Sequence, residues 1–132
     1  MEPMENELVF DVQEVSYAYE GRQAALDHVS MQVRAGECLV VLGANGCGKS
    51  TLLKLLDGLY FPTGGTILAF GEPLTEAALR ADEFNFRFRR RVGLVFQDFR
   101  LVDDLSVLAN VLLPTTFRRW NPGAELRARA LA

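Results

Sequence analysis

The chain of 132 residues is 49% hydrophobic and 23% charged, which is the size and composition of one soluble globular domain. No apolar run is long enough to cross a bilayer, and Met1 to Glu7 are acidic and polar, whereas a secretory signal begins basic and continues apolar. The two cysteines, Cys38 and Cys47, lack the spacing of a metal site or a disulfide framework, so we expect a reducing, cytoplasmic location.

The net charge of −3 hides an uneven distribution along the chain. Residues 1–86 carry 5 basic and 13 acidic side chains, whereas residues 87–132 carry 9 basic and 4 acidic ones. A basic half can face nucleic acid, lipid headgroups or an acidic partner, but solvated helix faces explain such charge more often. On that basis we expect no nucleic-acid partner.

The first segments predict an antiparallel β layer in which each strand buries one face. Apolar residues alternate and then change parity, at Leu8, Phe10 and Val12 and afterwards at Val15, Tyr17 and Tyr19. A strand with a bulge near Gln13-Glu14 explains that change. A turn at Glu20-Gly21-Arg22 precedes a second alternation, at Val29, Met31 and Val33, which predicts the next strand.

A glycine-rich loop follows, between an apolar run and a helical pattern. Cys38 to Leu42 are apolar throughout, which predicts a strand covered on both faces. The loop itself reads Gly43-Ala44-Asn45-Gly46-Cys47-Gly48-Lys49-Ser50-Thr51, and the helix after it has a stripe at Leu52, Leu55, Leu56 and Leu59. Strand, loop and helix in this order predict a phosphate-binding P-loop rather than a simple turn.

The residue types of the loop suit the binding of a nucleotide with Mg²⁺. Its glycines let backbone N–H groups turn toward an anion, and the helix N-terminus adds further N–H groups and a positive dipole. Lys49 can reach the β- and γ-phosphates, and Ser50 offers a hydroxyl to Mg²⁺. The expected nucleotide-binding residues of the loop are Gly43, Asn45, Gly46, Cys47, Gly48, Lys49, Ser50 and Thr51.

Beyond the loop helix the pattern is weaker. Thr66 to Phe70 predicts a short strand, and residues 74–91 fit either a weak helix or an extended chain. Val92 to Phe96 predicts another apolar strand, which ends at Gln97. Farther on, Ser106 can cap a helix, and Asn121-Pro122 has the cap and first-turn proline of a last one.

Several short motifs around the P-loop occur in order: Tyr17-Ala18-Tyr19-Glu20-Gly21, Leu26-Asp27-His28-Val29-Ser30, Ala35-Gly36-Glu37, Pro62-Thr63-Gly64-Gly65-Thr66-Ile67 and Val95-Phe96-Gln97. From about Leu8 onward they resemble the N-terminal half of the ATP-binding cassette (ABC) transporter ATPases. The resemblance implies an α/β P-loop NTPase fold, with a RecA-like core and an N-terminal antiparallel β subdomain, truncated before the second half of the core. It assigns residues 1–97 to the core half with the β subdomain and residues 98–132 to the start of a helical subdomain.

The resemblance also implies roles for single residues. Tyr19 matches the aromatic residue that stacks on the adenine of ATP, with Tyr17, on the same strand face, as the alternative. Gln97 matches the glutamine that reaches Mg²⁺ and the attacking water. The implied catalytic residues are thus Lys49 and Gln97, the implied metal ligands are Ser50 and Gln97, and the implied cofactors are ATP and Mg²⁺.

Different parts of the chain resemble different branches of the family. Leu56 to Thr63 and Phe84 to Arg91 are similar to the cobalt/nickel energy-coupling-factor ATPases, whereas Asp98 to Val111 is closer to the phosphonate-importer and cell-division ATPases. The family's Leu-Ser-Gly-Gly-Gln signature, a strand ending in Asp-Glu and the switch histidine do not occur in these 132 residues. The resemblance therefore implies an N-terminal fragment, which we expect to be inactive alone.

The function implied is that of an ATP-binding subunit, an ABC-type ATPase that powers solute transport through an integral membrane permease. Such a subunit pairs with a second ATPase subunit and lies in the cytoplasm at the inner face of the cell membrane. The alternative is an ABC-type scaffold in cell division that moves no solute. A small P-loop kinase or GTPase is less consistent with the ordered motifs and with the lack of an Asn-Lys-x-Asp sequence.

Overall fold

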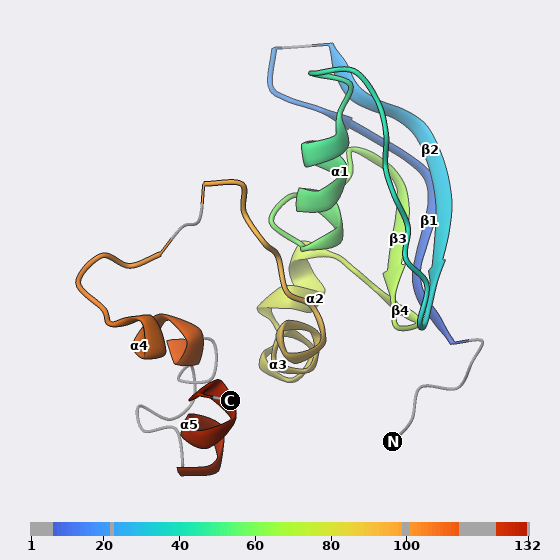
Figure 1. Cartoon of the computed structure of the whole chain (residues 1–132). Coiled ribbons are helices and arrows are strands. Elements are labelled where there is room, and N and C mark those ends of the chain that lie inside the picture. Colours follow the sequence, from blue (N-terminus) through green and yellow to red (C-terminus); the bar gives the residue numbers. More distant parts are fainter. Residues whose placement is uncertain (1–6, 22, 99–100, 114–123, 132) are drawn as a thin grey trace. The chain divides into compact units, whose positions relative to one another are not determined.

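The computed structural model describes residues 7–21, 23–98, 101–113 and 124–131, which fall into two compact units, 1–94 and 95–132. The first unit contains, in chain order, β1 (Leu8–Ala18), β2 (Ala24–Arg34), α1 (Lys49–Leu56), β3 (Gly64–Ala69), β4 (Glu72–Pro73), α2 (Glu76–Arg80) and α3 (Asp82–Arg91) (Figure 1). The second contains α4 (Val107–Leu112) and α5 (Ala124–Leu131). Among the helices of these ranges, none combines the length and apolar character needed to cross a membrane.

The strands of the first unit form one antiparallel sheet in the order β2-β1-β3-β4. Strand β1 lies between β2 and β3, so its inward side chains are well covered, and Val12 and Val15 are 1% and 0% exposed. Helices α1 and α3 pack on one face of the curved sheet (Figure 1) and add Leu55 and Phe88 to the same core. Burial of these apolar side chains is the main source of stability for the unit.

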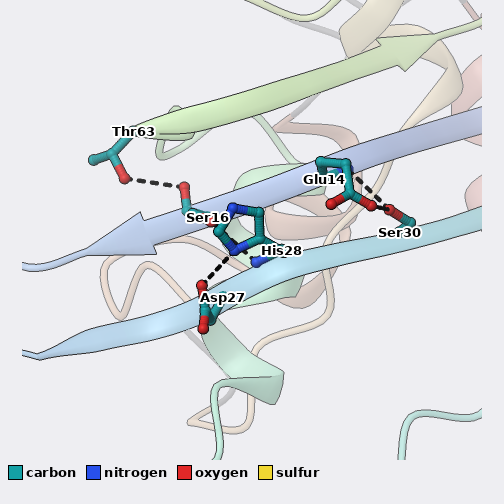
Figure 2. A network of polar contacts seen from close by, with 6 residues as sticks. All are labelled: Glu14, Ser16, Asp27, His28, Ser30 and Thr63. Atoms are coloured by element: carbon teal, nitrogen blue, oxygen red, sulfur yellow. Dashed lines mark hydrogen bonds and ion pairs between the residues drawn. The ribbon is translucent and has the colours of Figure 1, made fainter.

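Two compensating bulges bend the β1–β2 hairpin, one of them where the change of parity predicted it. Glu14 and His28 have positive φ angles of 49° and 48°, and the register shifts on both sides of the Val15 pairing. Each bulged N–H is bonded by a serine of the opposite strand: Glu14 N donates to Ser30 Oγ at 2.9 Å, and His28 N donates to Ser16 Oγ at 3.0 Å (Figure 2). The first bulge places both Val12 and Val15 on the buried face, which confirms the predicted change of parity.

The apolar segments Cys38 to Leu42 and Val92 to Phe96 form no strand, so the strands predicted there are wrong for this structure. Leu42 is 86% exposed and Val95 is 95% exposed. A strand buried on both faces depends on neighbours that supply ladder hydrogen bonds and cover its side chains. No described strand pairs with either segment, and without such a partner apolar composition alone does not make a strand.

Residues 74–91, for which the sequence left two alternatives, form two helices. Thr75 caps α2, because its hydroxyl oxygen accepts a hydrogen bond from Ala78 N at 3.1 Å. In α3, Phe84 and Phe88 are four residues apart, lie on one face and pack against each other with ring centroids 5.9 Å apart. Arg89, on the same helix, donates to the main-chain oxygen of Asp57, the C-cap of α1, at 2.7 Å.

In the second unit, the predicted helix after Ser106 is present as α4. Ser106 Oγ accepts a hydrogen bond from Ala109 N at 3.2 Å, as expected of a helix cap. Asn110 organises the preceding turn, because its side chain bonds both the N–H and the carbonyl of Val102 and the carbonyl of Leu105. The predicted cap at Asn121-Pro122 lies outside the described residues.

Candidate nucleotide-binding site

The predicted P-loop connects the irregular segment after β2 to helix α1 (Figure 1). Gly48 is the N-cap of α1 and has a φ of 99°, a left-handed conformation that favours glycine. A side chain at this position would also collide with the carbonyl oxygen of Ala25 in β2. Glycine therefore lets the loop approach the end of the β1–β2 hairpin closely.

The N-terminus of α1 is suited to an anion. No side chain from the described residues caps it, and its first turn contains no acidic residue. The initial N–H groups of a helix have no intrahelical partners and lie at the positive end of its dipole. A phosphate at this end meets both hydrogen-bond donors and a favourable potential.

Lys49 lies over the loop from which it emerges. Its Nζ donates to the carbonyl oxygens of Gly43 and Ala44, both at 2.8 Å, and lies 3.7 Å from Cys47 Sγ. These contacts hold the loop around one ammonium group, which supplies positive charge next to the helix N-terminus. Asn45 and Gly46 form the exposed turn between these contacts.

Ser50 and Thr51 have different environments although they are adjacent. Ser50 is exposed in the first turn of α1, whereas Thr51 is 6% exposed and its hydroxyl oxygen lies 3.0 Å from that of Tyr19. Part of the loop helix thus faces solvent, and part is bonded to the segment that follows β1. In the part of the chain that the structure describes, no group of three or more His, Cys, Asp or Glu side chains is arranged to hold a metal ion.

Three tyrosines gather beside α1. Tyr17 and Tyr60 stack nearly parallel, with centroids 5.5 Å apart, and Tyr19 lies edge-to-face with both. Burial raises the pKa of the Tyr17 phenol, and neighbouring Tyr19 and Tyr60 add to that rise while Lys54 opposes it. The sequence did not single out Tyr60; its signal was an aromatic residue two positions after Gly58, at the end of the predicted helix.

Gln97 belongs to the second unit, where it is exposed in a turn after the Val92 to Phe96 segment. The residues that the first unit brings together are those of the P-loop and the tyrosines. The Tyr19–Thr51 hydrogen bond joins two predicted nucleotide-binding residues that are far apart in the sequence.

The model of the family described as ABC transporter matches residues 26–131. The nickel import ATP-binding protein NikO of Rhodobacter capsulatus is 52% identical over 89 residues, which are 67% of this chain and 35% of that protein. The phosphate-import ATP-binding protein PhnC of Mycolicibacterium smegmatis is 50% identical over 122 residues, 85% of this chain and 44% of that protein. The phosphonates import ATP-binding protein PhnC of Frankia casuarinae is 48% identical over 92 residues, 69% of this chain and 35% of that protein. The predicted likeness to nickel-importer and phosphonate-importer ATPases is thereby confirmed.

Solved structures agree with the predicted fold class. A dimeric post-hydrolysis structure of the ATP-binding cassette MJ0796 with ADP and Pi superposes with a TM-score of 0.77 at 33% identity, over 92% of this chain and 54% of that one. The structure of cbiO1 from Clostridium perfringens, part of the transporter complex cbiONQ, gives a TM-score of 0.73 at 30% identity, over 93% and 47%. The chain thus spans less than half the length of NikO and of the Mycolicibacterium smegmatis PhnC, at 35% and 44%. Because the family model matches residues 26–131, which are most of this chain, the chain belongs to the ABC transporter ATPase family.

Proposed function

We propose that this chain forms the P-loop part of an ATP-binding subunit that uses Mg-ATP to power import through a membrane permease. The observation that carries the proposal is the position of Lys49 Nζ over the loop, 2.8 Å from two of its carbonyl oxygens, at an uncapped helix N-terminus. The importer names of the nickel, methionine and phosphate relatives favour transport over a scaffold in cell division.

Phosphate binding is assigned to the loop from Gly43 to Thr51. Lys49 would shift from its own loop carbonyls toward the β- and γ-phosphates, where a full negative charge is a better partner for an ammonium than a carbonyl dipole. The N–H groups of Asn45, Gly46, Cys47 and Gly48 and of the first turn of α1 would complete the cradle.

The residues present fit Mg²⁺. This ion keeps several waters and is usually held by one or two protein oxygens together with substrate phosphates, so an exposed Ser50 hydroxyl beside Lys49 is a sufficient anchor in the loop. We assign Gln97 as the second protein ligand and as the residue that orients the attacking water. When bound, the ion neutralises charge that develops on the phosphate oxygens.

Tyr19 is assigned as the adenine platform. It is tied to the loop helix through Thr51, whereas one face of Tyr17 is already covered by the parallel ring of Tyr60. Helix α1 would therefore fix both ends of the nucleotide, because it contains Lys49 at the phosphates and Thr51, which is hydrogen-bonded to Tyr19 at the base. We further assign residues 1–97 to the nucleotide-binding core and residues 98–132 to the start of a helical subdomain, in keeping with the helices α4 and α5.

The remaining assignments concern the whole protein. The subunit would work in the cytoplasm at the inner face of the membrane, bound to an integral permease and paired with a second ATPase subunit. The loop from Gly43 to Thr51 would contact phosphate already in the ground state, whereas rate acceleration needs interactions that strengthen in the transition state. The family resemblance assigns much of that task to the signature, Asp-Glu and histidine motifs, which do not occur in these 132 residues. We therefore expect this polypeptide to bind nucleotide but to show no phosphate release above background.

Titration calorimetry of Mg-ATP on the wild type, Lys49→Ala and Arg80→Ala tests the proposal. Arg80 is an exposed cation on α2 that pairs with Glu76, so its removal changes the net charge equally without touching the loop. Lys49→Ala should lose at least the roughly 1.5–3 kcal/mol of a charge-assisted hydrogen bond, while Arg80→Ala binds as the wild type does. Equal affinities for wild type and Lys49→Ala, with circular dichroism showing both folded, would contradict the proposal.

A further inference from the structure

We propose that Tyr60 is a positioning residue that fixes the Tyr19 ring relative to the phosphate loop. The inference rests on the proposed function, in which Tyr19 stacks on adenine. Tyr60 itself is not placed against the nucleotide; it acts through Tyr17 and Tyr19 and through helix α1.

The first support is the geometry of the three rings. Tyr60 and Tyr17 stack with an interplanar angle of 4°, and Tyr19 meets Tyr17 at 88° and Tyr60 at 89°, with centroids 5.1 and 5.9 Å away. Offset stacking and edge-to-face contact are the arrangements that aromatic quadrupoles prefer. The Tyr19 ring is thus contacted by two rings whose own planes are nearly parallel, which restricts its rotation.

The second support is the way Tyr60 is held. Its backbone N–H and that of Leu59 both donate to the carbonyl of Lys54, at 3.2 and 2.9 Å, just beyond the C-terminal end of α1. The ammonium of Lys54 lies 5.2 Å from the centroid of the Tyr60 ring, within the range of a cation–π interaction. Backbone and side chain of Tyr60 are therefore both bound to the last turn of α1.

The first turn of the same helix holds Tyr19 at another point, through the bond to Thr51. Helix α1 begins with Lys49, so it supplies the phosphate-binding lysine, the Thr51 anchor and, at its far end, the Tyr60 anchor. A short rigid helix thereby sets the position of the tyrosine ring relative to the loop. Pre-organisation of this kind lowers the ordering cost of binding one ligand at two points.

The test compares the wild type with Tyr60→Leu, Tyr60→Phe and Tyr19→Ala, using Mg-ATP and magnesium tripolyphosphate as probes in calorimetry. Tripolyphosphate reports on the loop without the base. Tyr60→Leu should weaken ATP binding about two- to tenfold, the equivalent of an aromatic contact, and leave tripolyphosphate binding unchanged. Tyr60→Phe keeps the ring and should restore ATP affinity.

Each other outcome is informative. If Tyr19→Ala lowers ATP affinity while Tyr60→Leu does not, the positioning role is overturned and the adenine platform stands. If Tyr19→Ala changes nothing, the platform itself is overturned. Equal losses for ATP and tripolyphosphate in Tyr60→Leu would mean that Tyr60 only supports the fold. If Tyr60→Leu fails to fold, Tyr60→Met replaces it, and loss of folding in both variants likewise assigns a structural role and overturns the proposal.

Discussion

The hydroxyl oxygens of Tyr19 and Thr51 lie 3.0 Å apart, so the segment after β1 is hydrogen-bonded to the first turn of the P-loop helix. Thr51 is nearly buried, at 6% exposure, and its hydroxyl requires a partner in that setting. The contact couples the end of β1 to the loop helix through these two side chains.

Two substitutions of Tyr19 should distinguish the contribution of its ring from that of its hydroxyl. Tyr19→Phe keeps a stacking surface but removes the bond to Thr51, so we expect a loss of about 0.5–1.5 kcal/mol in the free energy of unfolding. Tyr19→Ala should also weaken ATP binding by the roughly 1–3 kcal/mol of a base–aromatic stack. Chemical denaturation and calorimetry measure the two effects, and a larger loss of ATP affinity in Tyr17→Ala would move the platform to Tyr17.

The P-loop was predictable because its determinants are local. Glycine spacing, Lys49 and the leucine stripe lie within one short stretch of sequence. Its contacts with Tyr19 and Ala25 join distant segments, and no local pattern names such partners. The sequence therefore pointed to Tyr17 and Tyr19 but not to Tyr60, the third member of the tyrosine cluster.

Helix α3 illustrates a different limit of sequence patterns. Phe84, Phe86 and Phe88 alternate with polar residues as in a strand, yet the segment is helical. Phe84 and Phe88 are also one helical turn apart and are buried together, while Phe86 lies near the guanidinium of Arg90, 5.3 Å from its ring centroid. The same phenylalanines fit both the two-residue repeat of a strand and the turn of a helix, and burial of Phe84 and Phe88 in the core favours the helix.

Nucleotide should protect one cysteine and not the other. Both thiols are exposed, which corrects the expectation that Cys38 lies in a buried strand. Cys47 Sγ is 3.7 Å from Lys49 Nζ, where we place the phosphates, whereas Cys38 precedes the loop. Saturating Mg-ATP should slow maleimide labelling of Cys47 several-fold and leave Cys38 as an internal control, with the sites resolved by peptide mass spectrometry. Equal labelling of Cys47 with and without Mg-ATP, at concentrations that saturate binding, would argue against phosphates at this loop.

The serines that bond the bulged strands should contribute to stability. Ser30 Oγ accepts from Glu14 N at 2.9 Å and donates to Glu14 Oε1 at 2.7 Å (Figure 2). Ser30→Ala removes both bonds to Glu14, whose backbone has a positive φ. We therefore expect a loss of about 1 kcal/mol in the free energy of unfolding. Gln23→Ala, an exposed change near the start of β2, is the control and should alter stability by less than about 0.5 kcal/mol. Urea denaturation of the three proteins measures these differences in stability. Equal midpoints for wild type and Ser30→Ala would show that Ser30 does not stabilise the bulge.

Asp57 should make the stability of the first unit depend on pH. Burial raises the pKa of its carboxyl group, and the charge and hydrogen bond of Arg89, whose Nη1 is 3.3 Å from Oδ2, only partly oppose that rise. Because the folded protein holds this proton more strongly than the unfolded chain, the stabilisation is complete below the unfolded pKa, near 3.8, and is lost as pH rises through the folded value. Asp57→Asn removes the titration but keeps the bond from Arg89 to the main-chain oxygen, at 2.7 Å in the wild type.

The free energy of unfolding of Asp57→Asn relative to wild type should therefore increase with pH across the acidic range and then level off. Denaturation at a series of pH values measures that difference, with Arg89→Met as the comparison in which the carboxylate loses its counter-charge and destabilisation grows with pH. A difference between Asp57→Asn and wild type that falls with pH would show that Arg89, rather than burial, controls this carboxyl group, and a constant difference would show that the two effects cancel; either result contradicts the prediction.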